Sequence, residues 1–455
     1  MTFSALDSAL TGPLLATDAM RDCFSDTARL RAMLAAETAL ARAEAGLVPD
    51  GLAPALEAMD PESLDAVAIG RQTALAGVPT IPFVKAVQAR LPPELERGFH
   101  KGATTQDILD TALVLQVRDA LALLVQDMDG VLAGLSAMAE RHRAAPCAGR
   151  TYGQHAAPVT FGFKAAGWLA GVAEAAERLP ALRERVLVAS LAGPVGTLSG
   201  LGARGPAVAG AFAAALGLGS ACLAWHARRG RIAELGCWLA QLVGALAKMA
   251  TDLAHLASTE VGEVAEPFQP GRGGSSAMPH KRNPVSSTVI LAAHGTAPGL
   301  AASLLAGMAA AHERPAGAWH AEWHALPTLF GLASGALREA RVLAEGLEID
   351  PARMRRNLDA TGGLLFADAA AARLSPLGRE RAHTLVEHAA ATVRETGETL
   401  DAVLKRDPAV REAGIDLAPA FDLAPAIAAA GPWVDRALAE AARIRTTLHA
   451  GKDVP

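Results

Sequence analysis

The side chains best suited to chemistry gather in residues 271–284, which read GRGGSSAMPHKRNP. Three glycines in the first four positions make this backbone conformationally free. After them, Ser275 is a candidate base or nucleophile, Lys281 is a cation and Asn283 is an amide donor. Such a loop can hold a carboxylate and stabilise negative charge that develops on it. A glycine-rich linker has the same composition, so composition alone leaves that alternative open.

A second polar stretch lies where a long helical pattern begins. Residues 100–107 read HKGATTQD and offer the imidazole of His100 and the hydroxyls of Thr104 and Thr105. The N-terminus of the following helix favours an anion. Thr105 could equally be only a helix cap, and the two roles are compatible.

A third stretch and one arginine complete the set of candidates. Residues 150–158 read RTYGQHAAP and offer Thr151, Gln154 and His155. His155 is the leading candidate for a substrate-binding histidine, with a histidine packed outside a helix bundle as the alternative. Arg314 follows a helix without charged residues, and it is either a substrate contact or a solvated surface arginine. We expect no metal site, because no cluster has the spacing of metal ligands.

The elements that must position these residues are helical. Apolar periodicity predicts helices over residues 29–45, 105–143, 161–188 (kinked or split at Pro180), 229–263, 285–311 and 327–345. Before residue 105 and after residue 349, prolines predict shorter helices. The helix over 285–311 has no charged residue but is rich in Ala, Gly, Ser and Thr, so we expect it to be buried on all sides in a bundle rather than to span a membrane. The pattern predicts an all-α protein with an N-terminal domain (1–105), a central long-helix bundle (106–346) and a C-terminal domain (347–455).

Composition excludes several classes of function. The 455 residues carry 42 basic and 47 acidic side chains, a formal charge of −5, without a basic arm or an acidic tail. Nucleic acid is therefore not an expected partner. The four scattered cysteines form no CxxC pair and are expected to be reduced thiols of a cytoplasmic protein. The N-terminus lacks the pattern of a signal peptide.

The three polar stretches together resemble the signature segments of the fumarase/aspartase superfamily. Residues 274–283 match the specific pattern GSSxMPxKxN, residues 100–107 resemble HxGxTSxD, and residues 150–158 resemble RTHxQxAxP. The resemblance covers essentially the whole chain. It implies three helical domains, a homotetramer with a central twenty-helix core, active sites shared between subunits, a small-molecule substrate and no cofactor.

The superfamily adds or eliminates groups beside a carboxylate through an aci-carboxylate intermediate. By resemblance, Ser275 is the base, and Lys281 and Asn283 hold the carboxylate. Serine is a poor base in water, so this role requires an electropositive and dry site. The remaining predicted substrate-binding residues are His100, Thr104, Thr105, Thr151, Gln154, His155, Ser276, Met278 and Arg314.

Two departures from the superfamily pattern indicate which branch the chain resembles. Many members pair a histidine in the second segment with a glutamate after the signature loop, and the pair handles the proton of a leaving amine or hydroxyl. Here these positions are Tyr152 and Thr288. A leaving carboxylate needs no such help, because a carboxyl pKa of about 4 keeps it stable as the anion. This favours the cycloisomerase branch, which converts the tricarboxylate 3-carboxy-cis,cis-muconate to 4-carboxymuconolactone in the protocatechuate branch of aromatic degradation.

Three alternatives stay open. A lyase that releases nitrite from nitrosuccinate would also explain Tyr152 and Thr288. An adenylosuccinate-type lyase would normally keep the missing pair. A structural homologue without catalysis would have no need of Ser275, Lys281 and Asn283.

Overall fold

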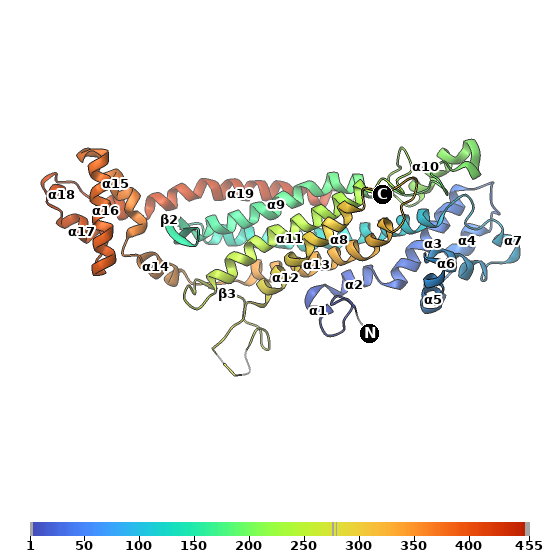
Figure 1. Cartoon of the computed structure of the whole chain (residues 1–455), viewed down its shortest axis with the longest axis horizontal. Helices are drawn as coiled ribbons and strands as arrows, with labels where there is room; N and C mark the ends of the chain where they lie inside the picture. Colours follow the sequence, from blue (N-terminus) through green and yellow to red (C-terminus); the bar gives the residue numbers. More distant parts are fainter. Residues whose placement is uncertain (1–2, 275–276, 279, 451–455) are drawn as a thin grey trace.

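The computed structural model describes residues 3–274, 277–278 and 280–450. The chain is an elongated all-α structure, in which long helices run along the main axis between two groups of shorter helices (Figure 1). This confirms the predicted fold class. The division into three domains stays an interpretation of the sequence pattern.

The N-terminal region is built from short helices around one longer one. Asp26 opens the longer helix, α3 (Asp26–Ala43), after Ser25, whose hydroxyl caps the helix by accepting the N–H of Ala28. The other helices of this region are α1 (Gly12–Leu15), α2 (Asp18–Cys23), α4 (Leu52–Glu57), α5 (Ala66–Ala76), α6 (Thr80–Gln88) and α7 (Pro93–Glu96).

Five long helices form the central bundle, as apolar periodicity predicted. They are α8 (Thr105–Arg141), α9 (Phe161–Val186), α11 (Gly230–Leu256), α12 (Val285–Ala306) and α13 (Ala318–Gly346). Small residues let their axes approach closely. A Cβ at Gly236 in α11 would lie 2.3 Å from Cδ1 of Leu304 in α12. The short helix α10 (Gly205–Ala215) precedes α11 and packs near α3.

Prolines interrupt these helices less than the sequence indicated. α9 continues through Pro180, and α13 begins at Ala318 rather than at Pro327. A proline removes one hydrogen bond from a helix interior, and tertiary packing can override that cost. In α13, buried Trp319, Leu326 and Leu329 lie on both sides of Pro327 and hold the helix in the bundle.

The expectation that the helix from 285 is buried on all sides is wrong for a single chain. Two helices, α11 and α12, are long and apolar enough to cross a membrane by length and composition, and the chain buries 61% and 39% of their most apolar windows. The exposed face of α12 carries small or weakly polar residues, among them Ala292, Thr296 and Ser303. Periodicity in a sequence does not distinguish a face covered by the same chain from one left for another surface.

The C-terminal region has its own small core and then returns to the bundle. Its elements are α14 (Pro351–Asp359), α15 (Ala367–Arg373), α16 (Arg379–Thr396), α17 (Leu400–Arg406), α18 (Pro408–Glu412) and α19 (Ala424–Ala450). A separate apolar cluster centred on Val386, Leu400 and Leu404 holds α15–α18 together. The sequence predicted only short helices after residue 349, but α19 continues through Pro432 and packs along α9 and α8.

Two short antiparallel pairs of strands interrupt the helical pattern. β1 (Pro146–Thr151) pairs with β2 (Gln154–Thr160), with Arg150 opposite His155 and Thr151 opposite Gln154. β3 (Val264–Ala265) pairs with β4 (Glu348–Ile349). The first pair forms the hairpin between α8 and α9, and it carries the whole second segment.

A buried ionic cluster joins three bundle helices. Arg229, which is 1% exposed at the start of α11, donates to both oxygens of Asp110 in α8, at 2.7 and 3.1 Å, and to Glu322 in α13 at 2.8 Å. Trp319 also donates to Asp110, at 3.0 Å. Burial raises the pKa of Glu322, and Arg229 opposes this rise. Removing one partner of such a buried cluster is costly, so it fixes how these helices meet.

Candidate active site

Asp107 organises the first segment from within the protein. Its carboxylate is 0% exposed. Oδ2 accepts the backbone N–H groups of Thr104 and Gly193, both at 2.9 Å. Oδ1 accepts the N–H of Ala192 at 2.9 Å and lies 2.7 Å from Nε2 of His226. This one side chain therefore fixes the first turn of α8 against residues 192–193, and with it the position of Thr104.

His100 is held by a buried carboxylate on α3. Its Nδ1 lies 2.6 Å from Oε1 of Glu37, whose side chain is 0% exposed. Burial by itself lowers the pKa of His100, but the contact with Glu37, together with the nearby Asp107 and Glu44, raises it above its ordinary value. Glu44 is also buried behind it, and burial raises the pKa of Glu44 to about 7. The imidazolium form of His100 is thus favoured at the start of α8.

Arg314 joins the same cluster from a distant part of the chain. Its Nη2 donates to Oγ1 of Thr104 at 2.8 Å and to the carbonyl of Pro194 at 3.4 Å. Its Nε is buried and has no partner among the described residues. Thr105 is half-buried as the first residue of α8. The structure therefore brings Arg314 to Thr104, beside His100 and Thr105, so Arg314 is not a freely solvated surface residue.

The hairpin positions the second segment at a tight turn. Tyr152 and Gly153 connect the two strands with φ values of 51° and 76°, as a type I′ turn requires. Thr151 and Gln154 are exposed and pair across this turn. His155 is half-buried, and its buried Nδ1 has no partner among the described residues. Burial lowers the pKa of His155, and Arg150 lowers it further, which favours the neutral ring.

The turn end of the hairpin is fixed by an ion pair with Glu263, which directly precedes β3. Arg150 donates from Nη1 to Oε2 of Glu263 at 3.1 Å and from Nη2 to Oε1 at 2.5 Å. Asn357 in α14 donates to the same Oε1 at 2.8 Å. Glu263 is 0% exposed, so this planar pairing has a defined geometry. Arg150 is therefore a structural anchor of the second segment.

We call the described residues of the segment 271–284 (271–274, 277–278 and 280–284) the ribbon, and several contacts hold its two stems in place. Gly274 bridges Arg282, and the N–H of Asn283 donates to the carbonyl of Gly273 at 2.9 Å. Arg272 pairs with Glu339, and Arg282 donates to both oxygens of Glu348 at 2.8 and 3.0 Å. The ribbon projects from the side of the bundle near β3 (Figure 1).

Of the predicted catalytic residues, Lys281 and Asn283 lie on this ribbon. Ser275 and Ser276 lie outside the described residues. Lys281 is exposed, Asn283 is half-buried and Met278 is 43% exposed. Glu266 accepts the N–H groups of Ser286 and Ser287, both at 2.8 Å, and so caps the helix α12 that follows the ribbon.

The two departures from the superfamily pattern are both exposed. Tyr152 is 104% exposed at the tip of the hairpin. Thr288 is exposed on α12, and its hydroxyl donates to the carbonyl of Pro284 at 2.7 Å. A hydroxyl engaged in this way is a poor proton donor to a leaving group.

The three segments do not converge within one chain. The first lies at the α3 and α10 end, the hairpin lies near α14, and the ribbon projects from the bundle (Figure 1). Backbone strain marks the same segments: of the four described non-glycine residues with positive φ, His100, Tyr152 and His312 lie within or directly beside the predicted site segments.

Sequence patterns did not identify the two buried acids that hold predicted site residues in place. Asp107 was part of the matched pattern but was not assigned a role, and Glu37 lies 63 positions from His100. The available signals were the match of Asp107 to the HxGxTSxD pattern and the apolar neighbours of Glu37 in its helix. Among the described residues, no group of three or more His, Cys, Asp or Glu side chains is arranged to hold a metal ion.

Comparisons with known proteins agree with this fold and these segments. Residues 14–299 match the family described as Lyase, and residues 363–437 match the family described as Adenylosuccinate lyase C-terminus. The chain belongs to the lyase family of the fumarase/aspartase superfamily.

Three named proteins are similar to this chain over most of its length. The 3-carboxy-cis,cis-muconate cycloisomerase of Pseudomonas aeruginosa is 47% identical over 430 residues, which cover 92% of this chain and 94% of the relative. The crystal structure of 3-carboxy-cis,cis-muconate lactonizing enzyme from Pseudomonas putida matches with a TM-score of 0.92 and 45% identity, and covers 96% of this chain and 100% of that one. The nitrosuccinate lyase of Streptomyces davaonensis is 44% identical over 452 residues, covering 96% of this chain and 95% of that protein.

Proposed function

We propose that this protein is a cycloisomerase that converts 3-carboxy-cis,cis-muconate to 4-carboxymuconolactone. The observation that carries the proposal is the joint replacement of the superfamily's proton-handling pair by Tyr152 and Thr288, in a chain that keeps Ser275, Lys281 and Asn283. Full-length similarity to enzymes named for this reaction supports it.

The proposed chemistry consumes one proton from solvent and needs no other reactant. A carboxylate oxygen of the substrate adds to an alkene carbon and forms the lactone C–O bond. The alkene electron pair moves toward the neighbouring carboxyl and gives an aci-carboxylate, which Lys281 and Asn283 stabilise. The carbon next to that carboxyl then takes the proton that Ser275 carries, and solvent returns a proton to Ser275. In reverse, Ser275 removes this proton and a carboxylate leaves, which needs no acid.

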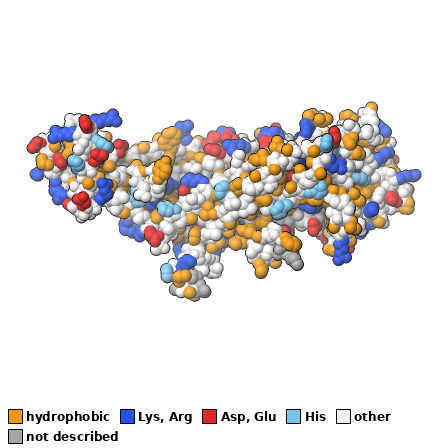
Figure 2. All heavy atoms as spheres, in the orientation of Figure 1, with side chains coloured by type: hydrophobic (Ala, Val, Ile, Leu, Met, Phe, Trp, Pro, Cys, Tyr) orange, Lys and Arg blue, Asp and Glu red, His pale blue; other side chains and the backbone are white. Residues whose placement is uncertain are grey.

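We further propose a homotetramer in which each active site combines segments of three subunits. The separation of the three segments in one chain supports this, as does the half-exposed apolar helix α12. Figure 2 shows hydrophobic side chains spread over the central bundle, whereas charged side chains are dense on the C-terminal helices at the left. We also place the enzyme in the cytoplasm and in protocatechuate breakdown; four free cysteines are compatible with a reducing compartment.

Nitrosuccinate lyase activity is the second candidate, because a relative of that name is 44% identical and nitrite also leaves without a proton. Product analysis separates the two. Incubation with 3-carboxy-cis,cis-muconate without added metal should remove the conjugated-diene absorbance and give lactone. Formation of fumarate and nitrite from nitrosuccinate, with carboxymuconate left unchanged, would refute the proposed function.

The Ser275→Ala variant tests the proposed base. Loss of a positioned general acid or base typically lowers turnover by about 10²–10⁴-fold. We expect a loss of this size with unchanged helix content and oligomeric state, measured by circular dichroism and light scattering. A near-normal kcat would remove Ser275 from this role.

A further inference from the structure

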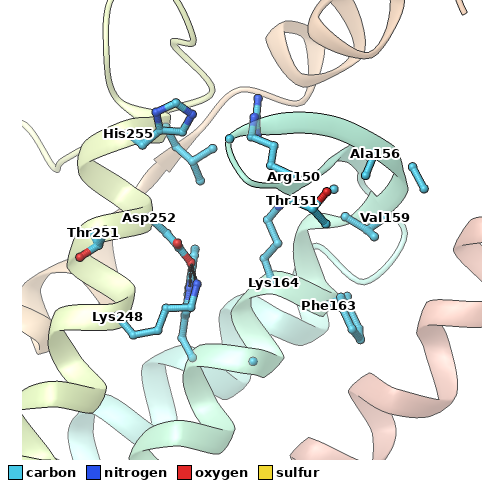
Figure 3. A pocket seen from close by; sticks show the side chains of 16 residues that line it. Arg150, Thr151, Ala156, Val159, Phe163, Lys164, Lys248, Thr251, Asp252 and His255 are labelled. Carbon is cyan, nitrogen blue, oxygen red and sulfur yellow. Dashed lines mark hydrogen bonds and ion pairs between the residues drawn. The ribbon is translucent and has the colours of Figure 1, made fainter. Parts of the chain in front are cut away.

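A pocket lies between the β1–β2 hairpin, the start of α9 and the end of α11. Its volume is about 740 Å³, within the range of small-molecule sites. Phe163, Trp168 and Leu256 supply apolar walls, and Thr151 of the second segment lies at its edge. Figure 3 shows the polar side chains that point into it from the three elements.

Most charges in this pocket neutralise one another. Arg150 is engaged by both oxygens of Glu263. Lys248 pairs with Asp252, which also accepts the indole N–H of Trp168 at 2.7 Å. These pairs leave no net charge for a ligand.

Lys164 is the exception. It is half-buried, and no hydrogen bond or ion pair to another described residue engages its ammonium. Figure 3 shows its side chain rising from α9 toward the hairpin. An ammonium carries three donors, and leaving it partly desolvated without a partner costs free energy. The pocket therefore holds one positive charge without a partner among the described residues, beside an apolar surface and the exposed Thr151.

We propose that this pocket binds one carboxylate of the substrate, with the ammonium of Lys164 as its cation and the Thr151 hydroxyl as a second donor. The identity of the substrate rests on the proposed function; the preference for a carboxylate on an apolar body does not. The predicted site otherwise draws its permanent cations from Lys281 and Arg314. A tricarboxylate has three anionic groups, and Lys164 raises the number of permanent cations in the predicted site from two to three.

Three variants test this inference. Lys164→Met removes the charge and keeps the length of the chain, Lys164→Arg keeps the charge, and Lys405→Met removes an equal charge from the exposed Lys405–Asp401 pair in α17. Loss of a charged hydrogen bond predicts that Lys164→Met raises KM for 3-carboxy-cis,cis-muconate by about tenfold to a hundredfold, with a smaller change in kcat. Lys164→Arg should recover most of the affinity, and Lys405→Met should match the parent protein.

A binding measurement separates this inference from the proposed function. Tricarballylate, a saturated tricarboxylate that cannot react, is titrated calorimetrically into the parent protein and the three variants. Weaker binding to Lys164→Met alone would support the pocket even if carboxymuconate were not turned over. Unchanged tricarballylate affinity in Lys164→Met, or no binding to the parent protein, would overturn it.

Discussion

Asp107 offers the sharpest test of how the first segment is built. In Asp107→Asn, one carboxylate oxygen becomes an amide nitrogen, which donates rather than accepts. In the parent protein, Oδ2 of Asp107 faces the N–H groups of Thr104 and Gly193, and Oδ1 faces the N–H of Ala192, the hydroxyl of Ser190 at 3.4 Å and Nε2 of His226. Neither orientation of an asparagine can satisfy both sets. At least one buried backbone N–H loses its acceptor whichever way the amide turns.

The expected cost follows from this geometry. Leaving a buried donor without an acceptor costs about 1–3 kcal/mol, a sizeable part of a typical stability of about 5–15 kcal/mol. We expect a clearly lower unfolding midpoint for Asp107→Asn in guanidinium chloride at fixed protein concentration. The matched control is Asp359→Asn, which alters only an exposed i,i+4 pair with Arg355 and should cost less than about 1 kcal/mol. Equal midpoints for the two variants would refute the role assigned to Asp107.

Two further variants test the other segments. Glu37→Gln should lower the pKa of His100, because Glu37 contributes most among the groups that raise that pKa above its ordinary value of 6.5. The Glu37 contribution to stability is therefore fully present below about pH 6.5 and is lost as the pH rises through the raised pKa. In denaturant titrations, the free energy of unfolding of Glu37→Gln should lie further below that of the parent protein at pH 6 than at pH 9. An equal difference at the two pH values would contradict this. Gly273→Ala places a Cβ 2.6 Å from the carbonyl oxygen of Asn283 at a φ of +66°, so turnover should fall by tenfold or more, about 1.4 kcal/mol. Gly271→Ala, with φ +80° and open space, controls for backbone strain alone; matching kinetics in these two alanine variants would exclude the contact with Asn283 as the cause.

Some of the architecture followed directly from local sequence. The helix from Thr105 was predictable because apolar periodicity runs unbroken through its 37 residues and threonines stand at its start. The β1–β2 hairpin was not, because its turn is Tyr152-Gly153 rather than Asn-Gly and its strands lack apolar alternation. The length of α19 was not predictable, because a proline inside a helix usually indicates a break. In the structure, α19 continues through Pro432 and packs against α9.

The sequence likewise predicted only some features of the candidate site. By itself, the sequence determined the chemical groups: Lys281 and Asn283 in the ribbon, His100 and Thr104 before α8, and the absence of the usual proton-handling pair. These depend on residue type and short spacing, which a linear pattern records.

Only the tertiary structure decided which groups meet and in what state. It joined Arg314 to Thr104 across 210 positions and placed Glu37 under His100 across 63. It also left Lys164 half-buried without a partner among the described residues, while giving Arg150 and Lys248 theirs. The physical reason is that burial and charge pairing depend on distances between helices, and these are set by packing over the whole bundle rather than by neighbouring residues in the chain.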